Sequence, residues 1–232
     1  MPVRTPNNRF GGRHMLVSFP SVKLGRAVAC ESLLEADAVE LLEGDPAVEW
    51  YEEQPFTIEY LHEGRIRRFT PDLAAHKGGG RLLIECKPDA LVDTAANRRK
   101  FAAARAWCAE HGWTFEVWTD VTLRAGHRLA NGKRLRPYAA RTPDPRTELR
   151  AREALTTTPG TALPLGELAA IVSAPERTPS LPFDDALADL LTLLRLGRLA
   201  YDPDAAPLTR ATPVRLPDRP MGDVKERADG GR

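Results

Sequence analysis

Residues 70–88, TPDLAAHKGGGRLLIECKP, decide how the first half of this chain folds. They place Asp72 directly after a proline, followed by a glycine-rich turn and an apolar strand that ends in Glu85 and Lys87. Because side chains alternate along a strand, pairing over this stretch brings Asp72 and Glu85 together, with Lys87 on the same face as Glu85. Converging carboxylates bind a hard cation, and a neighbouring lysine suits a phosphate or an attacking water. The pattern indicates metal-dependent phosphodiester cleavage.

The alternative is a surface Glu/Lys pair at the end of an ordinary strand, and the motif alone does not decide between the two. Three features favour the functional interpretation. Pro71 cannot donate to a sheet, so the chain is irregular at Asp72. Residues 82–84 predict a buried strand with Glu85 at its end. A helix over 94–111 and an apolar strand over 115–118 follow, as in an α/β core.

A third acid, Glu35, lies in a helix predicted over residues 32–42. The apolar stripe of this helix consists of Leu34, Ala38, Leu41 and Leu42. Ser32 is the predicted N-cap, and Glu35 stands three positions later, where a capping-box partner belongs. Spacing alone favours the cap for Glu35, and a turn toward the carboxylate site is the alternative.

Charge is segregated along the chain although the formal net charge is only +1. Residues 1–30 contain no acid, and residues 31–63 contain no Lys or Arg. A DNA enzyme needs such segregation, because acids concentrate a metal while bases hold phosphates. For the helix at 94–111 composition alone favours a solvated face, whereas the basic run from Arg124 to Arg152 favours phosphate contact. The candidate DNA contacts are Arg98, Arg99, Lys100, Arg105, Lys133, Arg134 and Arg136.

The chain's 232 residues suffice for one medium domain and one small one. We expect a cytoplasmic, nucleoid-associated protein with no membrane partner, because no signal peptide or membrane span is evident. Cys30, Cys86 and Cys108 lack zinc spacing and are predicted to be buried thiols, with Cys86 pointing into the core. No small-molecule cofactor is expected, since the glycines at 78–80 lack the Lys-Ser/Thr of a phosphate loop.

The second half of the chain has a different composition. Residues 141–145, RTPDP, predict a linker. Helices are predicted over 146–155, from 163 and over 182–196, followed by a hairpin over 197–208, which is a winged-helix arrangement. The third helix carries Asp184, Asp185 and Asp189, which favours protein docking over reading a DNA groove. From residue 211 the composition predicts a disordered tail.

From Arg26 to about Asp120 the chain resembles the TnsA-type endonuclease subunit of heteromeric bacterial transposases, a branch of the PD-(D/E)xK restriction-endonuclease-like nucleases. The matching text is ESLLEADAVELLEGDPAVEWYEEQPFTIEY, RRFTPDL, LLIECKP and WTFEVWTD. The resemblance implies an α/β fold: a restriction-endonuclease-like mixed-sheet core flanked by helices, with a small C-terminal winged-helix-like domain. The expected division is a basic flexible arm (1–28), a nuclease domain (29–140), a winged-helix-like domain (146–210) and a disordered tail (211–232).

The resemblance also implies the site. The catalytic residues would be Glu35, Asp72, Glu85 and Lys87, with Gln54 in support. Mg²⁺, replaceable by Mn²⁺, would be held by Glu35, Asp72, Glu85 and the backbone carbonyl of Cys86. Glu31 and Asp37 are neighbouring acids that compete with Glu35 for its assignment.

The implied function is DNA recombination by transposition. The chain would cleave one strand at transposon ends, while a DDE/integrase-like transposase subunit acts on the other strand. The alternatives are a stand-alone restriction or repair nuclease of the same fold, and a non-catalytic DNA-binding adaptor subunit.

Overall fold

The computed structural model describes residues 16–157, 162–174 and 182–218. The chain divides into two compact units, Met1–Lys133 and Arg134–Arg232, which are described separately. The division precedes the RTPDP segment that the sequence offers as a linker. Within the described ranges, no helix has the length and apolar character needed to cross a membrane.

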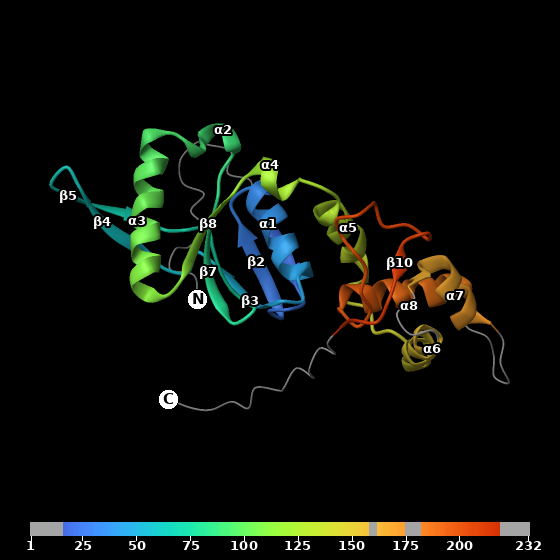
Figure 1. Cartoon of the computed structure of the whole chain (residues 1–232). Helices are drawn as coiled ribbons and strands as arrows, with labels where there is room; N and C mark the ends of the chain where they lie inside the picture. The colour runs from blue at the N-terminus through green and yellow to red at the C-terminus, as the bar shows by residue number, and fades with distance from the viewer. Residues whose placement is uncertain (1–15, 158–161, 175–181, 219–232) are drawn as a thin grey trace, which may run out of the picture. The chain divides into compact units, whose positions relative to one another are not determined.

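Unit 1 is built on a four-stranded mixed sheet (Figure 1). Its strand order is β3–β6–β7–β8: β6 is antiparallel to both β3 and β7, and β8 is parallel to β7. The strands are β3 (Val48–Glu53), β6 (Leu73–Lys77), β7 (Gly80–Cys86) and β8 (Thr114–Trp118). The predicted mixed sheet flanked by helices is therefore confirmed.

The two faces of this sheet bury different helices, as strand alternation requires. Leu82, Ile84 and Cys86 of β7 share one core cluster with residues of α1 (Leu33–Gly44). Leu83 faces the other way and packs with residues of α3 (Ala95–His111). A central strand buried on both faces reads as a continuous apolar run, which is why residues 82–84 show no polar alternation.

A tight turn sets the pairing of β6 with β7. Gly78 and Gly79 both have positive φ, 57° and 81°, and Lys77 pairs directly with Gly80. Two successive positive φ angles are the signature of a type I′ hairpin, which side chains with a Cβ resist. The turn therefore fixes the register in which Leu73 lies opposite Ile84.

The expected flexible arm over residues 1–28 is wrong for its described part, whereas residues 1–15 lie outside the described ranges. β1 (Val17–Ser21) and β2 (Arg26–Cys30) form an antiparallel hairpin whose Phe19 and Val28 are buried. Lys23 donates through Nζ to three backbone carbonyls near the end of α1, at 2.6–2.9 Å. A cation there offsets the negative end of the helix dipole, so this part of the basic segment is structural.

A second hairpin joins β3 to β6. β4 (Ile58–His62) pairs with β5 (Arg65–Phe69) around Glu63 and Gly64, whose φ angles are 50° and 70°. β5 ends at Phe69, because Pro71 interrupts the strand and the chain then enters β6. Figure 1 shows the hairpin projecting from the sheet beside α3.

Short helices follow β7 and β8 and continue into the start of unit 2. α2 (Asp89–Val92) follows β7, and α4 (Asp120–Leu123) follows β8. α5 (Arg128–Leu135) and a 3₁₀ turn at Arg136–Tyr138 follow α4. The helix predicted over 94–111 is confirmed as α3, which Thr94 caps by accepting from Asn97 N–H at 3.3 Å.

Unit 2 contains the three predicted helices, α6 (Pro145–Thr156), α7 (Leu165–Ser173) and α8 (Phe183–Arg195). The hairpin expected over 197–208 is wrong. Ala200 instead bridges Arg215, and β9 (Leu163–Pro164) pairs with β10 (Pro213–Val214). Val214 is fully buried, so the expected disordered tail is also wrong for residues 211–218, whereas 219–232 lie outside the described ranges.

The acidic character of α8 is only partly a surface feature. Asp189 is 1% exposed and accepts hydrogen bonds from Arg141 Nε, Asp144 N–H and Thr147 Oγ1. Asp189 therefore stabilises the fold of this unit and is not available for docking.

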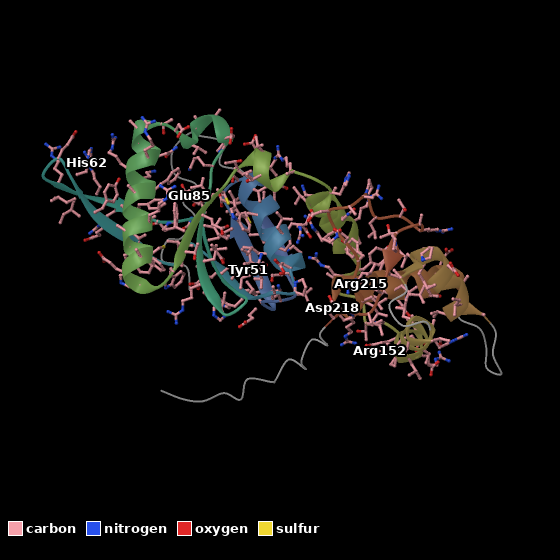
Figure 2. The ribbon with its side chains drawn as sticks, viewed as in Figure 1. Tyr51, His62, Glu85, Arg152, Arg215 and Asp218 are labelled. Atoms are coloured by element: carbon pink, nitrogen blue, oxygen red, sulfur yellow. The ribbon has the colours of Figure 1, made fainter. Side chains whose placement is uncertain are left out.

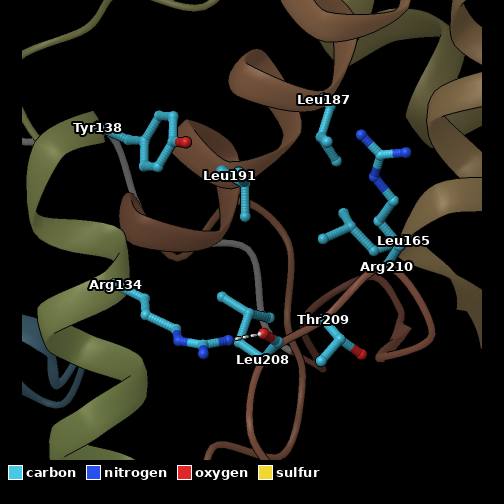
Figure 3. Close-up of a pocket in the computed structure, with 8 residues that line it drawn as sticks. All are labelled: Arg134, Tyr138, Leu165, Leu187, Leu191, Leu208, Thr209 and Arg210. Carbon is cyan, nitrogen blue, oxygen red and sulfur yellow. Dashed lines mark hydrogen bonds between the residues drawn. The ribbon is translucent and has the colours of Figure 1, made fainter.

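Unit 2 also contains a cavity of about 270 Å³ (Figure 3). Its lining includes Leu165, Leu187, Leu191 and Leu208, with Arg134 and Arg210 beside them.

Candidate active site

The register of β6 and β7 places Asp72 beside the end of β7. Leu73 pairs with Ile84, so the preceding residue, Asp72, lies opposite Glu85. Asp72 Oδ2 accepts a hydrogen bond of 2.7 Å from the backbone N–H of Cys86. The chain before β6 is irregular at Pro71, so the Asp72 side chain, and not a backbone carbonyl, accepts the hydrogen bond from the Cys86 N–H. The convergence of Asp72 and Glu85 that the sequence predicts is present.

Glu85 is a buried glutamate with one unused oxygen. Its residue exposure is 3%, and Figure 2 labels it on unit 1 near the end of β7. Lys87 Nζ lies 3.0 Å from Glu85 Oε1, which places both side chains on one face as predicted. Glu85 Oε2 is buried and has no hydrogen-bond partner among the described residues. An unpaired carboxylate oxygen in a low-dielectric site is costly, so this atom calls for a ligand.

The electrostatics of Asp72 reflect crowding by acids. Burial raises the pKa of Asp72 well above its usual value, and the charges of Glu85 and Glu35 raise it further. The Cys86 N–H and the Lys87 charge act in the opposite direction but do not outweigh burial. Glu85, which is buried, and Asp72 and Glu35, which are half-buried, thus repel one another unless a cation or a proton joins them.

Lys87 remains charged despite its position. Burial lowers the pKa of Lys87, but the charge of Glu85 and the hydrogen bond to it more than compensate, so the net shift is upward. Its backbone N–H donates to Trp118 O at 3.0 Å, which anchors the end of β7 to β8. The ammonium group is therefore held beside Glu85 as a fixed positive charge.

Glu35 occupies the cap that its spacing favours. Glu35 N–H donates to Ser32 Oγ at 3.1 Å, Ser32 Oγ donates to Glu35 Oε1 at 2.8 Å, and Glu31 N–H donates to Glu35 Oε2 at 2.7 Å. The pKa of Glu35 is raised overall. Burial is the largest cause and the charges of Glu31 and Glu85 add to it, whereas the hydrogen bonds from Glu31 N–H and Ser32 Oγ lower it. Glu35 is thus close enough to feel Glu85, while both of its oxygens hold the start of α1.

Gln54 lies next to the acids in a strained conformation. Its φ is +45°, a region that non-glycine residues seldom occupy, and its N–H donates to Asp72 O at 2.8 Å. Gln54 Nε2 donates to Glu31 Oε1 at 3.0 Å. A carboxylate only accepts, so the amide nitrogen must face Glu31 and the amide oxygen must face away. Gln54 Oε1 is buried and has no partner among the described residues.

The Cys86 side chain is buried in the core cluster that β7 shares with α1, as predicted. Burial raises the pKa of its thiol well above the usual value, and the charges of Asp72, Glu35 and Glu85 add to the shift. The thiol is therefore protonated and a poor nucleophile at neutral pH. Cys30 and Cys108 are also buried and free, and burial raises the pKa of Cys30 to about 12.

The residues present fit a divalent cation in chemistry but not as a closed cage. Within the described ranges, no three His, Cys, Asp or Glu side chains gather as a group that could hold a metal ion. The two buried unpartnered side-chain atoms found in those ranges are Glu85 Oε2 and Gln54 Oε1. Both are oxygens, which Mg²⁺ and Mn²⁺ prefer as ligands. The donor set therefore suits a hard cation supported by water and substrate oxygens.

The candidate DNA contacts come from several elements of the two units. Arg98, Arg99 and Arg105 are exposed on α3, while Lys100 lies over the Phe69 ring at 5.8 Å. Lys133 pairs with the buried Asp37 and so stabilises unit 1. Arg134 and Arg136 belong to unit 2, where Arg134 Nη1 donates to Leu208 O at 2.6 Å. Among these candidates, the three arginines of α3 form a group of exposed cations on one helix.

Sequence reasoning missed two supports of the site. Glu31 orients the Gln54 amide, and Arg26 forms a two-pronged ion pair with Glu53 at 2.7 Å, immediately before Gln54. Burial raises and the Arg26 hydrogen bond lowers the pKa of Glu53, and the net shift is downward. No local signal identifies either support, because both contacts join residues more than twenty positions apart in the sequence.

The site thus combines the buried Glu85, the half-buried Asp72 and Lys87 at the end of a central strand of a mixed α/β domain. Residues 45–120 match the family model described as TnsA-like endonuclease N terminal. This segment is a TnsA-like endonuclease N-terminal domain, which confirms the resemblance found in the sequence. The family points to a nuclease and implies DNA as its substrate.

The matched segment includes Gln54, Asp72, Glu85 and Lys87 but begins after Glu35. The family match therefore bears on the strand-borne residues and not on the first helix. No curated protein sequence matches the chain.

Proposed function

We propose that this chain is a Mg²⁺-dependent DNA endonuclease. It would hydrolyse one strand at a transposon end, with an integrase-like transposase subunit acting on the other strand. The supports are the TnsA-like N-terminal domain at residues 45–120 and the acid pair at the end of β7. The partner and the transposon-end substrate rest on the family resemblance.

The observation that carries the proposal is the unpaired Glu85 Oε2 beside Asp72. Burying a glutamate and leaving one of its oxygens without a hydrogen-bond partner lowers the stability of the fold. A residue with a purely structural role would not be expected to carry this cost. Burial raises the pKa of Asp72, and the charges of Glu85 and Glu35 raise it further; a divalent cation would satisfy the free oxygen and also offset that repulsion. One ligand thus accounts for both features.

The proposed cation ligands are Asp72, Glu85 and the backbone carbonyl of Cys86. The N–H of Cys86 points to Asp72, and N–H and C=O of one strand residue point to the same side of the strand. When bound there, Mg²⁺ supplies positive charge to the phosphate and acidifies a water. Glu35 is a further proposed ligand, which would bind through lone pairs that its cap bonds leave free.

Lys87 is proposed to act on the reacting phosphate. Glu85 holds its ammonium group at 3.0 Å, so the positive charge is in place before substrate arrives. A preorganised charge stabilises negative charge that builds on the phosphate oxygens, and it also orients an attacking water. Gln54 Oε1 is proposed to accept a hydrogen bond from that water, because the amide is held in position by Glu31.

The second unit is proposed to be a winged-helix-like docking domain for the partner transposase. Its element order, α6–β9–α7–α8–β10, and the pairing of β9 with β10 support this interpretation. The side chains of Asp184 and Asp185 on α8 are 92% and 56% exposed, which gives the helix an acidic outer face unsuited to a DNA groove. The exposed arginines of α3 in unit 1 are the proposed phosphate contacts.

The test is a nicking assay of the full chain on supercoiled DNA that carries transposon ends, with and without a candidate partner transposase and Mg²⁺. The matched pair is Glu85→Gln against Glu49→Gln, which removes an exposed carboxylate from β3 of the same sheet. We expect nicking by the wild type and Glu49→Gln and none by Glu85→Gln. Equal nicking by both variants would contradict the proposed site. Nicking without any transposase would favour the stand-alone nuclease, and tight DNA binding without nicking would favour the adaptor.

A further inference from the structure

The β4–β5 hairpin exposes apolar side chains where a free-standing ribbon would be expected to carry polar ones. Leu61 and Ile66 lie directly opposite each other and are 74% and 69% exposed. The four residues from Arg65 to Arg68 are all exposed, so β5 meets solvent on both faces near the tip. A two-stranded ribbon in water is only marginally stable, so an exposed apolar pair at this place indicates a surface that another molecule covers.

The charges of the hairpin identify the chemistry of that molecule. The side chains of Arg65 and Arg67 have no ion-pair or hydrogen-bond partner in the part of the chain that the structure describes. Arg68 differs, because its Nε lies 2.8 Å from Glu59 Oε1. Arg67 pairs across the ribbon with Tyr60, and Arg65 with His62, so the two unpaired arginines share one face. Phosphate and guanine edges are the partners that free arginines suit best.

The hairpin begins and ends at the candidate active site. Gln54 N–H bonds Asp72 O at 2.8 Å across its base, and Thr57 Oγ1 lies 2.8 Å from Thr70 Oγ1 one step further out. Figure 2 labels His62 at the outer end of the ribbon, away from Glu85. A five-residue strand spans about 17 Å, and the extended path from Asp72 to the tip is at most about 27 Å. At 3.4 Å per nucleotide, this reach corresponds to roughly five to eight base pairs.

We infer that the β4–β5 hairpin is a DNA-reading ribbon that enters the major groove roughly five to eight base pairs from the cleaved bond. The major groove is wide enough for a two-stranded ribbon. Arg65 and Arg67 contact phosphates or guanine edges on one face, and the Leu61–Ile66 pair on the other face contacts thymine methyl groups. The inference rests on the proposed nuclease function for its reference point, the scissile phosphate. It adds a specificity element that lies outside the acid site.

The stiffness of the hairpin supports this role. Glu63 and Gly64 form a two-residue loop with positive φ angles, which fixes the pairing of His62 with Arg65. Ile58 and Phe69 at the base are buried against α3 and β7 residues, so the ribbon is anchored at the site and free at its tip. A preformed ribbon loses little conformational entropy when DNA binds.

The first test measures DNA affinity and does not depend on cleavage. The full chain, with metal chelated, is titrated with a fluorescent duplex of mixed sequence at several salt concentrations. The double variant Arg65→Ala/Arg67→Ala is compared with Arg81→Ala, an exposed arginine at the start of β7, away from Glu85. We expect the double variant to bind more weakly, with a salt slope smaller by about one for each arginine lost, and Arg81→Ala to match the wild type. Identical affinity and slope for all three proteins would overturn the inference.

The second test locates the ribbon on DNA. A photo-crosslinking amino acid replaces Leu61 in the full chain, and the crosslinked base is mapped relative to the nick. We expect crosslinks roughly five to eight base pairs from the nick. Crosslinks to a second copy of the chain, or to another protein, would overturn the inference even where nicking is normal. If no nick forms under any condition, the nuclease proposal fails, while crosslinking to DNA still reports on the ribbon.

Discussion

Two buried glutamates in unit 1 show how a framework carboxylate differs from a site carboxylate. Glu43 is 8% exposed and accepts four hydrogen bonds at 2.6–3.0 Å. The donors are Ser21 Oγ, Tyr51 OH and the backbone N–H groups of Val22 and Lys23. Figure 2 labels Tyr51 and Glu85 on the same unit. Glu43 ties β1, the chain after it and β3 to α1, and both of its oxygens are satisfied.

Glu85 is more deeply buried yet has a single charged partner, Lys87, and one oxygen without any. Its neighbour Asp72 has a raised pKa through burial and like charge. The fold thus provides hydrogen-bond donors for both oxygens of Glu43, which joins structural elements, but leaves one oxygen of Glu85 without a donor where the carboxylates converge. The difference indicates that the site keeps coordination positions for a ligand that comes from solution.

The largest expected effect is on stability and concerns Glu43. Truncation leaves the hydroxyls of Ser21 and Tyr51 without an acceptor, at about 1–3 kcal/mol for each buried group. We expect Glu43→Ala to lower the free energy of unfolding by about 2–6 kcal/mol more than Glu85→Ala, since the shared loss of buried methylenes cancels in the comparison. Urea unfolding of the metal-free chain measures this difference. An equal cost would mean that the two glutamates play the same structural role.

The second effect is on catalysis and concerns Glu85 and Lys87. Removing one preorganised charge from an active site lowers the rate by about 10²–10³-fold. We expect losses of that size for Glu85→Gln and Lys87→Met in nicking of plasmid DNA, with an unchanged circular dichroism spectrum. Glu49→Gln is the control and should cleave normally. A variant at position 85 or 87 with near-normal nicking would remove that residue from the site.

A smaller effect separates the two roles of Glu35. Loss of an N-cap costs about 0.5–2 kcal/mol, so Ser32→Ala and Glu35→Gln should both lower the melting temperature slightly. Ser32→Ala should leave the nicking rate per folded molecule unchanged. A rate loss confined to Glu35→Gln would show that Glu35 contributes to the site in addition to the cap. Equal, normal rates for both variants would confine Glu35 to the cap.

The smallest effect is a difference of sign between two aspartates. Asp72 has a raised pKa, so in the metal-free chain it opposes folding as pH rises through its unfolded pKa of about 3.9. Burial raises the pKa of Asp45, but Lys77 and the hydrogen bond from the Ala47 N–H lower it by more, so the net shift is downward. The charged form of Asp45 therefore stabilises the fold above its unfolded pKa, and this stabilisation is lost in acid. At neutral pH, Asp72→Asn should raise the melting temperature and Asp45→Asn should lower it. The Asp72 difference should vanish below its unfolded pKa, near pH 3, whereas the Asp45 difference should fade only as pH falls through the lowered folded pKa of Asp45. The same sign for both variants at neutral pH would contradict the charge assignment.

The strand-borne half of the site could be predicted from sequence because short-range rules place it. Alternation puts Glu85 and Lys87 on one face, and the glycine turn fixes the register that brings Asp72 opposite Glu85. The Ser32–Glu35 cap followed from spacing for the same reason.

The remaining parts depended on long-range contacts. Nothing local to Gln54 reveals that Glu31 orients its amide, or that its φ is positive ahead of Pro55. The β1–β2 hairpin was mistaken for an arm because the absence of acids outweighed the apolar alternation of Phe19 and Val28, which only burial against α1 makes informative. In unit 2, the pairing of β9 with β10 joins residues about fifty positions apart, which no local pattern specifies.

Titration of the metal-free full chain with Mn²⁺, followed by electron paramagnetic resonance, tests the central claim most directly, because it requires neither DNA nor a partner. The comparison is wild type, Glu85→Gln and Glu49→Gln. The proposed site predicts saturable Mn²⁺ binding in the wild type and Glu49→Gln, displaced by excess Mg²⁺ and lost in Glu85→Gln. Equal binding by all three proteins, or no saturable binding by the wild type at millimolar Mn²⁺, would contradict a metal site at Asp72 and Glu85.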